Sequence, residues 1–425
     1  MLFMSEILSA SGLLSISVLG PLPFIYPLLN GTIVHDIQRL HQVYGLILRI
    51  APNEGPVWWK RQPGSLDSLV SAIDPETHTH TRKALAPAFT TRALSAQEPI
   101  LQQYLNLLVE RLTEQATKQA TKQSDIYSSF DCLQNSRYHP WISLLFNSVK
   151  AASCVAAARF YPFIEFLLMK CIPPSLKEMQ RDHYQQIVNK IEGRLNLELE
   201  QPDTMSHFIA GRDKTAFSRE ETNATFMVLT IAGSETTATV LGGTLNYLVR
   251  HPDKIAILSG EIRERFDSYE SMTLDALRAL PYLNLVINEG LRLCPPIPWV
   301  LPRRVPAAGD TVCGVWLPGG TPVSIQAYTT NRDPTYFHSA TSFHPERWLP
   351  GEMENPESPF FHDQRSGFQP FSVGLRSRMG QNLALAEMRL VPAKLLWKFD
   401  FHALRTFLLV EKEPIMIRMV TRQST

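Results

Sequence analysis

One segment constrains the fold more than any other, the long and largely apolar run Glu220–Arg250. At about 1.5 Å per residue, a helix over this range is about 45 Å long, enough to cross a whole domain. Apolar residues on most sides of such a helix place it in the interior. Its middle nevertheless carries the polar stretch Gly233–Thr237 (GSETT). A carboxylate there is costly unless it has a partner or a function. Either these hydroxyls bond back to helix carbonyls and bend the helix, or the polar residues take part in chemistry.

Helical periodicity also covers most of the remaining chain. Further helices are predicted over Pro99–Glu114, Trp141–Phe166, Ser175–Glu200, Pro252–Phe266, Thr273–Arg292 and Gln381–Phe399. Strand patterns are short and occur at Ile47–Ile50 and Thr311–Ile325, where Gly314 and a Pro-Gly-Gly turn separate β-rich runs. The fold class is therefore predicted to be mainly α with minor β.

Composition excludes several functional classes. The 425 residues carry a formal net charge of +1, which gives no reason to expect a nucleic acid partner. Five scattered cysteines without a CxxC pair predict neither a disulfide framework nor a structural zinc site. The uncharged run Ile7–Leu29 is long enough to span a bilayer. Residues 1–29 are therefore predicted to be a membrane anchor, with a partly buried segment as the alternative, ahead of one domain over residues 30–425.

Two further motifs combine charge with special backbone geometry. Glu289 and Arg292 lie three residues apart, so a helix places them on one face, between apolar neighbours. A buried pair of this kind needs a planar third donor, which Arg347 in the PERW stretch could supply. The glycine-bearing loop Phe371–Gly380 runs straight into a predicted helix, and a helix N-terminus favours negative charge.

The stretches AGSETT, EGLR, PERW and FSVGLRSRMG, in this order between Thr225 and Arg389, resemble the cytochrome P450 haem-thiolate monooxygenases. The chain is closest in character to fungal secondary-metabolite hydroxylases. The resemblance implies a cytochrome P450-like triangular fold, shortened in the N-terminal half, with haem as cofactor. It also implies a hydrophobic small-molecule substrate and an NADPH-cytochrome reductase as partner. The N-terminus would attach the protein to the cytosolic face of the endoplasmic reticulum membrane.

The resemblance implies roles for individual residues on three helices or their flanks. Glu235 and Thr236 would be the catalytic acid–alcohol pair that relays protons to bound dioxygen. Glu289, Arg292 and Arg347 would form a structural triad that steadies the haem-binding loop.

The same resemblance assigns the cofactor-binding residues. Phe371 would pack beside the proximal ligand of the iron, and Gly374 and Gly380 would let the loop pass close under the porphyrin. Three arginines would pair with the haem propionates, a task that suits a forked guanidinium. They are Arg82, Arg303 and Arg376.

The chain departs from the family pattern at the position that should hold the iron. Arg376 and Gly380 fix the register of the loop, so the family's cysteine is replaced by Arg378, and no metal ligand is predicted there. A thiolate promotes O–O cleavage by pushing electron density onto the iron. A guanidinium stays protonated and has no lone pair to offer, so it cannot take that role.

Other departures point the same way. Pro392 falls inside the last predicted helix, where a proline costs roughly 3 kcal/mol. The segments GPVWWKRQPGSLDSLVSAI and KQSDIYSSF look like shortened versions of longer family segments. Three hypotheses follow: an active monooxygenase, a non-catalytic relic of a secondary-metabolite gene set, or a protein that binds haem or a hydrophobic ligand without activating oxygen. The missing thiolate argues against the first and makes haem binding an open question.

Overall fold

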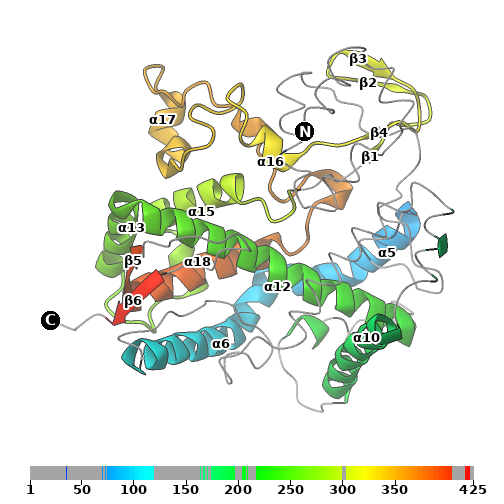
Figure 1. Cartoon of the computed structure of the whole chain (residues 1–425), viewed down its shortest axis with the longest axis horizontal. Coiled ribbons are helices and arrows are strands. Elements are labelled where there is room, and N and C mark those ends of the chain that lie inside the picture. The colour runs from blue at the N-terminus through cyan, green and yellow to red at the C-terminus, as the bar shows by residue number, and fades with distance from the viewer. Residues whose placement is uncertain are drawn as a thin grey trace. The chain divides into compact units, whose positions relative to one another are not determined.

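The computed structural model describes residues 74–118, 174–196, 217–298, 303–403 and 417–421, with residues 203–206 and a few other positions between 35 and 208. Two compact units divide the chain. The first comprises Met1–Ser65, Pro140–Gln186 and Pro298–Thr330, and the second comprises Leu66–His139, Ile187–Ile297 and Asn331–Thr425. Helices dominate the described residues and strands are short, which confirms the predicted class of mainly α with minor β (Figure 1).

The second unit holds most of the helices. Its α-helices are α5 (Pro75–Leu85), α6 (Thr91–Lys118), α12 (Arg219–Arg250), α13 (Pro252–Arg265), α14 (Leu274–Arg278), α15 (Pro281–Leu293), α17 (Pro350–Glu354) and α18 (Gln381–Lys398). Helix α10 (Pro174–Leu195) begins in the first unit and ends in the second. Short 3-10 turns are η2 (Ala86–Phe89), η3 (Pro345–Trp348), η4 (Arg365–Gly367) and η5 (Gly374–Arg376). One antiparallel pair, β5 (Phe399–Ala403) and β6 (Ile417–Thr421), follows α18.

Two small hairpin-like pairs make up the described sheet structure of the first unit. Strand β1 (Arg303–Arg304) pairs with β4 (Pro322–Val323), and β2 (Asp310–Val312) pairs with β3 (Val315–Leu317). Both pairs are antiparallel, and α16 (Ala327–Thr330) follows them. The β-rich pattern predicted for Thr311–Ile325 is therefore confirmed as three very short strands.

Helix α12 follows the prediction for Glu220–Arg250 to within one residue. It begins with a capping box, in which the Glu221 amide donates to Ser218 Oγ and the Ser218 amide donates to Glu221 Oε2. Along its middle, Thr236 Oγ1 donates to the Ala232 carbonyl at 2.6 Å, so this hydroxyl bonds back to the helix. By length and composition, α12 is the one described helix that could cross a membrane, and it contacts α15 and α18 (Figure 1).

The single helix predicted for Thr273–Arg292 is wrong. The structure breaks it into α14 and α15, with Leu280 in an extended conformation between them. The cause is Pro281, because a proline disfavours helical geometry in the residue before it and suits the first position of a helix. Thr273 caps α14 through its hydroxyl, which accepts the Ala276 amide.

Several predictions lie outside the described residues. These are the anchor Ile7–Leu29, the strand Ile47–Ile50, nearly all of the helix Trp141–Phe166, and the two segments that look shortened.

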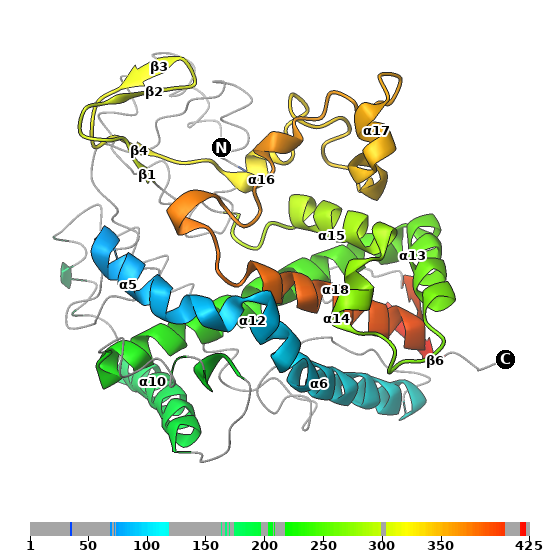
Figure 2. The same ribbon diagram turned by 180° about the vertical axis from the view of Figure 1, so that it is seen from behind.

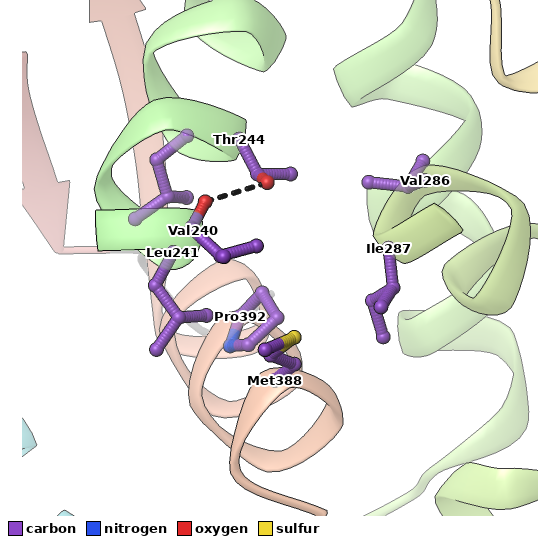
Figure 3. Close-up of a pocket in the computed structure, with 8 residues that line it drawn as sticks. Val240, Leu241, Thr244, Val286, Ile287, Met388 and Pro392 are labelled. Carbon is purple, nitrogen blue, oxygen red and sulfur yellow. Dashed lines mark hydrogen bonds between the residues drawn. The ribbon is translucent and has the colours of Figure 1, made fainter. Parts of the chain in front are cut away.

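The main hydrophobic core of the second unit surrounds α18. Helices α12, α13, α14 and α15 all contact it, and Figure 2 shows α13 and α14 beside it from behind. The predicted helix Gln381–Phe399 is thereby confirmed, and it continues through Pro392. Pro392 and Met388 line a small apolar cavity, about 10 Å³, opposite Val286 and Ile287 of α15 (Figure 3). This cavity lies where helices α12, α15 and α18 meet.

Replacing Pro392 with valine is expected to raise the free energy of unfolding by about 1–2 kcal/mol. Valine restores an amide that can donate to the Met388 carbonyl four residues earlier, and its side chain is of similar size. Urea denaturation measures the change. The matched control is Pro252→Val, because Pro252 is at the first turn of α13, where its missing amide costs nothing. An equal or smaller gain at Pro392 would mean that the core has adapted to the proline.

Candidate functional site

Glu289 is the centre of a fully buried charge network at the end of α15. Both of its carboxylate oxygens accept from Arg292, at 2.8 Å from Nη2 and 2.9 Å from Nε. Arg347 Nε of η3 lies 3.2 Å from Oε1, so the structure brings the three predicted triad residues together. The His344 amide and the indole nitrogen of Trp348 also donate to this carboxylate, at 2.9 and 3.0 Å.

The two arginines use their remaining donors to hold the chain between residues 331 and 363. Arg292 Nη1 donates to the carbonyls of Asn331 and Ala340, both at 2.5 Å. Arg347 Nη1 contacts the Asp363 carboxylate, also at 2.5 Å. The Glu289 carboxylate therefore holds helix α15 to a long non-helical segment through the two arginines. This role is structural, because the hydrogen bonds that the carboxylate accepts leave no lone pair open to a substrate.

The pKa of Glu289 reflects this network. Burial raises it, but the hydrogen bond and charge of Arg292, the charge of Arg347 and the amide of His344 outweigh burial and hold it below its usual value. The carboxylate therefore stays ionised, as a structural anion must.

The loop from Phe371 to Gly380 turns sharply before it enters α18. Ser372 and Gly374 have positive φ values of 60° and 71°, a conformation that glycine adopts without strain. The Arg378 amide donates to the Phe371 carbonyl at 2.9 Å and closes the loop. Phe371 is buried in the core, and Gly380 is the N-cap of α18 without a side-chain cap. The loop therefore delivers Arg378 to a helix N-terminus.

Of the three predicted propionate-binding arginines, Arg376 lies in this loop and Arg82 contacts it. Arg82 of α5 donates from Nη1 to the Ser377 carbonyl at 2.6 Å and from Nη2 to Ser377 Oγ at 3.1 Å. Arg376 Nη2 donates to the Ala72 carbonyl at 2.7 Å. Burial and the charges of Arg376 and Arg82 hold the pKa of His78 below its ordinary value, so both guanidinium groups lie near this ring.

The third predicted arginine belongs to the other unit. Arg303 is exposed and begins β1 in the first unit, whereas Arg82, Arg376 and the loop belong to the second.

Arg378 differs from every other arginine of the site in its surroundings. Its side chain is half-buried, and burial alone lowers the pKa of its guanidinium. Within the part of the chain that the structure describes, no carboxylate pairs with it. The position does not fit haem iron, because a protonated guanidinium has no lone pair to donate. The backbone hydrogen bond to Phe371 closes the loop, and residue 378 places a guanidinium in it.

The predicted acid–alcohol pair lies on α12. Glu235 and Thr236 are both half-buried, and the Thr236 hydroxyl donates to its own helix. The next residue, Thr237, is buried and bonds to Glu387 of α18. Burial raises the pKa of Glu387 to about 7, although the hydrogen bond from Thr237 lowers it.

Three residues of these networks were missed from the sequence. Trp348 directly follows Arg347 in PERW, so its contact could have been anticipated. Glu387 carries a weaker signal, as a lone acid in the apolar run LALAEM. Asp363 has no signal, because only the folded loop brings it to Arg347.

The sequence of this chain is similar to those of known proteins of one family. A family model described as Cytochrome P450 matches residues 51–423. The cytochrome P450 monooxygenase lcsI of Purpureocillium lilacinum is 34% identical over 94% of this chain and 86% of its own length. The cytochrome P450 monooxygenase cpaH of Aspergillus oryzae is 35% identical over 88% of this chain and 80% of its own. The averantin hydroxylase of Dothistroma septosporum is 32% identical over 94% and 84%, respectively.

Proposed function

Because this chain belongs to the cytochrome P450 family, we propose that it is a protein of fungal secondary metabolism that no longer activates oxygen through a haem-thiolate centre. Its ancestral activity is the oxidation of a hydrophobic small molecule, and its present role is non-catalytic binding of a ligand. Haem is the cofactor of the family, and a thiolate ligand to its iron promotes O–O cleavage.

One feature of the sequence supports the proposal: in the register set by Arg376 and Gly380, Arg378 stands where the family pattern has its cysteine. The Phe371–Arg378 hydrogen bond keeps the loop closed, so the substitution changes the donor atom and leaves the loop in place. The retained network of Glu289, Arg292 and Arg347 is explained by its structural role, since it stabilises the fold whether or not iron is held. Glu235 and Thr236 are then remnants of a proton relay, and Arg82, Arg303 and Arg376 are cations formerly used for propionates.

The second candidate is an active monooxygenase, which the retained loop and triad favour. It would need an NADPH-cytochrome reductase and a hydrophobic substrate beside α12. Under either candidate, we propose that Ile7–Leu29 anchors the chain to the endoplasmic reticulum membrane, on the basis of its length and lack of charge.

Carbon monoxide difference spectroscopy tests the proposal. Purified with haem supplied and then reduced, the protein is expected to show no thiolate-specific shifted Soret band. Arg378→Cys is expected to produce that band, because it returns a thiolate to a loop that is already closed. Arg378→Ser is the control, because it removes the guanidinium without adding a strong ligand.

Two outcomes contradict the proposal. A shifted band or reductase-dependent turnover by the unmodified chain shows that oxygen activation survives. A cysteine variant that folds but behaves like the serine variant shows that Arg378 is not the cause of the loss.

A further inference from the structure

We infer that a groove between α6, the α13–α14 connection and the end of α18 binds a linear aliphatic polyamine. The groove is open to solvent, has a volume of about 810 Å³, and lies within the second unit, where α6 and α14 both contact α18. A volume of this order is usual for a small-molecule site. The inference goes beyond the proposed function, because none of the described residues that line the groove comes from α12 or from the Phe371–Gly380 loop.

Carboxylates line this groove from two sides. Glu110 and Glu114 belong to α6, and Asp267 and Glu270 belong to the α13–α14 connection. Glu114 pairs with Arg111 at 3.0 Å. The other three carboxylates are exposed, and within the described part of the chain none of them has an ion pair or a hydrogen-bond donor. Like charges around one groove favour a ligand of the opposite sign.

Two lysines oppose these carboxylates, and they do not balance them. Lys398 is the one cation among the described lining residues. Lys394 is fully buried, and its Nζ donates to the Asn106 side-chain oxygen at 2.8 Å and lies 3.8 Å from the centroid of the Tyr269 ring. Both of these contacts are neutral. Three unpaired carboxylates and two lysines therefore leave the groove with an excess of negative charge.

An aromatic wall adds a second, independent feature. Tyr269 and Trp397 both line the groove, are both half-buried, and have ring centroids 6.0 Å apart. The Tyr269 ring already holds the ammonium group of Lys394, so amine binding by this aromatic pair is realised within the protein itself. The Tyr269 hydroxyl is buried and has no hydrogen-bond partner among the described residues, which leaves unused polar capacity in this wall.

The spread of the acidic groups selects the kind of cation. Within the residues that the structure describes, no three Asp, Glu, His or Cys side chains come close enough together to hold one metal ion. The carboxylates are thus distributed along the groove, and several amino groups on one chain match them better than a single point charge. The methylene groups between the amines gain from contact with the aromatic wall, whereas a hydrated metal ion does not.

Calorimetric titration of the full-length protein with spermine at low ionic strength tests the inference. Hexane-1,6-diol has a chain without charge, and Mg²⁺ has charge without a chain. Both are expected to bind at least about tenfold more weakly than spermine, because each lacks either the ion pairs or the aromatic contacts.

Substitutions in the groove predict changes of opposite sign. Glu110→Gln and Asp267→Asn are each expected to weaken spermine binding about two- to fivefold, the usual effect of one exposed ion pair. Lys398→Gln is expected to tighten it by about the same factor, because it removes a like charge, and a purely structural lysine would not produce this result. The matched control is Glu264→Gln, which removes an exposed carboxylate of α13 outside the lining and is expected to change nothing.

The inference is overturned if both acidic-residue variants bind spermine as tightly as the unmodified protein, if Lys398→Gln weakens binding, or if Mg²⁺ or the diol binds equally well. Tetralysine, a peptide of the same charge as spermine, separates a small amine from a protein partner. Tighter binding of tetralysine than of spermine would show that the groove recognises a basic protein segment, and the polyamine assignment would be wrong.

Discussion

Replacing Glu289 with glutamine is expected to lower the free energy of unfolding by about 3–5 kcal/mol, because it leaves two buried guanidinium groups without their shared anion. Arg292 and Arg347 are both fully buried, and Glu289 lies 2.8 and 3.2 Å from them. Glutamine keeps an acceptor oxygen but turns an amide donor toward groups that only donate. Urea denaturation measures the loss as a lower midpoint at unchanged slope.

The control is Asp275→Asn on α14. Asp275 lies 3.7 Å from Arg278, but both side chains are more than half exposed, so breaking this pair is expected to change stability by less than about 1 kcal/mol. If Glu289→Gln costs no more than Asp275→Asn, the buried network does not stabilise the fold, and its structural role is refuted.

The fold could be predicted wherever local sequence and burial agree. Glu220–Arg250 was correct because its apolar length demands burial and Ser218 with Glu221 forms a capping box. Thr273–Arg292 was wrong because the apolar period continues through Pro281 although the backbone cannot. Periodicity indicates which face of a helix is buried. It does not reveal a break in the helical backbone when the same face stays buried on both sides of the break.

The candidate site shows the same division. Glu289 and Arg292 could be paired from a spacing of three residues, because helix geometry alone brings them together. Arg347 was proposed as the planar third donor that a buried pair needs, and the resemblance assigned it the same role, since no local rule spans the distance from α15 to η3. Asp363 could not be predicted, because its contact exists only once the loop after Arg347 has folded back.

The pH dependence of stability is expected to carry the signature of Glu387. Its pKa rises from an ordinary value of 4.5 to about 7, chiefly through burial on α18. A carboxyl with a raised pKa stabilises the fold fully below its unfolded pKa, and that contribution is lost as the pH rises through the folded value. Each unit of pKa difference is worth about 1.4 kcal/mol, so the loss of stability as the pH rises from 4.5 to 7 amounts to at most about 3.5 kcal/mol.

Glu387→Gln isolates this contribution, because glutamine can still accept the Thr237 hydroxyl but does not titrate. His78 and His344 act in the opposite sense, since their lowered pKa values make stability fall as the pH drops below their ordinary value. The quantity to follow is therefore the free energy of unfolding of Glu387→Gln minus that of the unmodified protein. This difference is expected to become more positive from pH 5 to pH 8. Thr237→Val removes the hydrogen bond that lowers the pKa of Glu387, so it is expected to shift this growth to higher pH. A difference that stays constant with pH would show that Glu387 is ionised in the folded protein throughout this range.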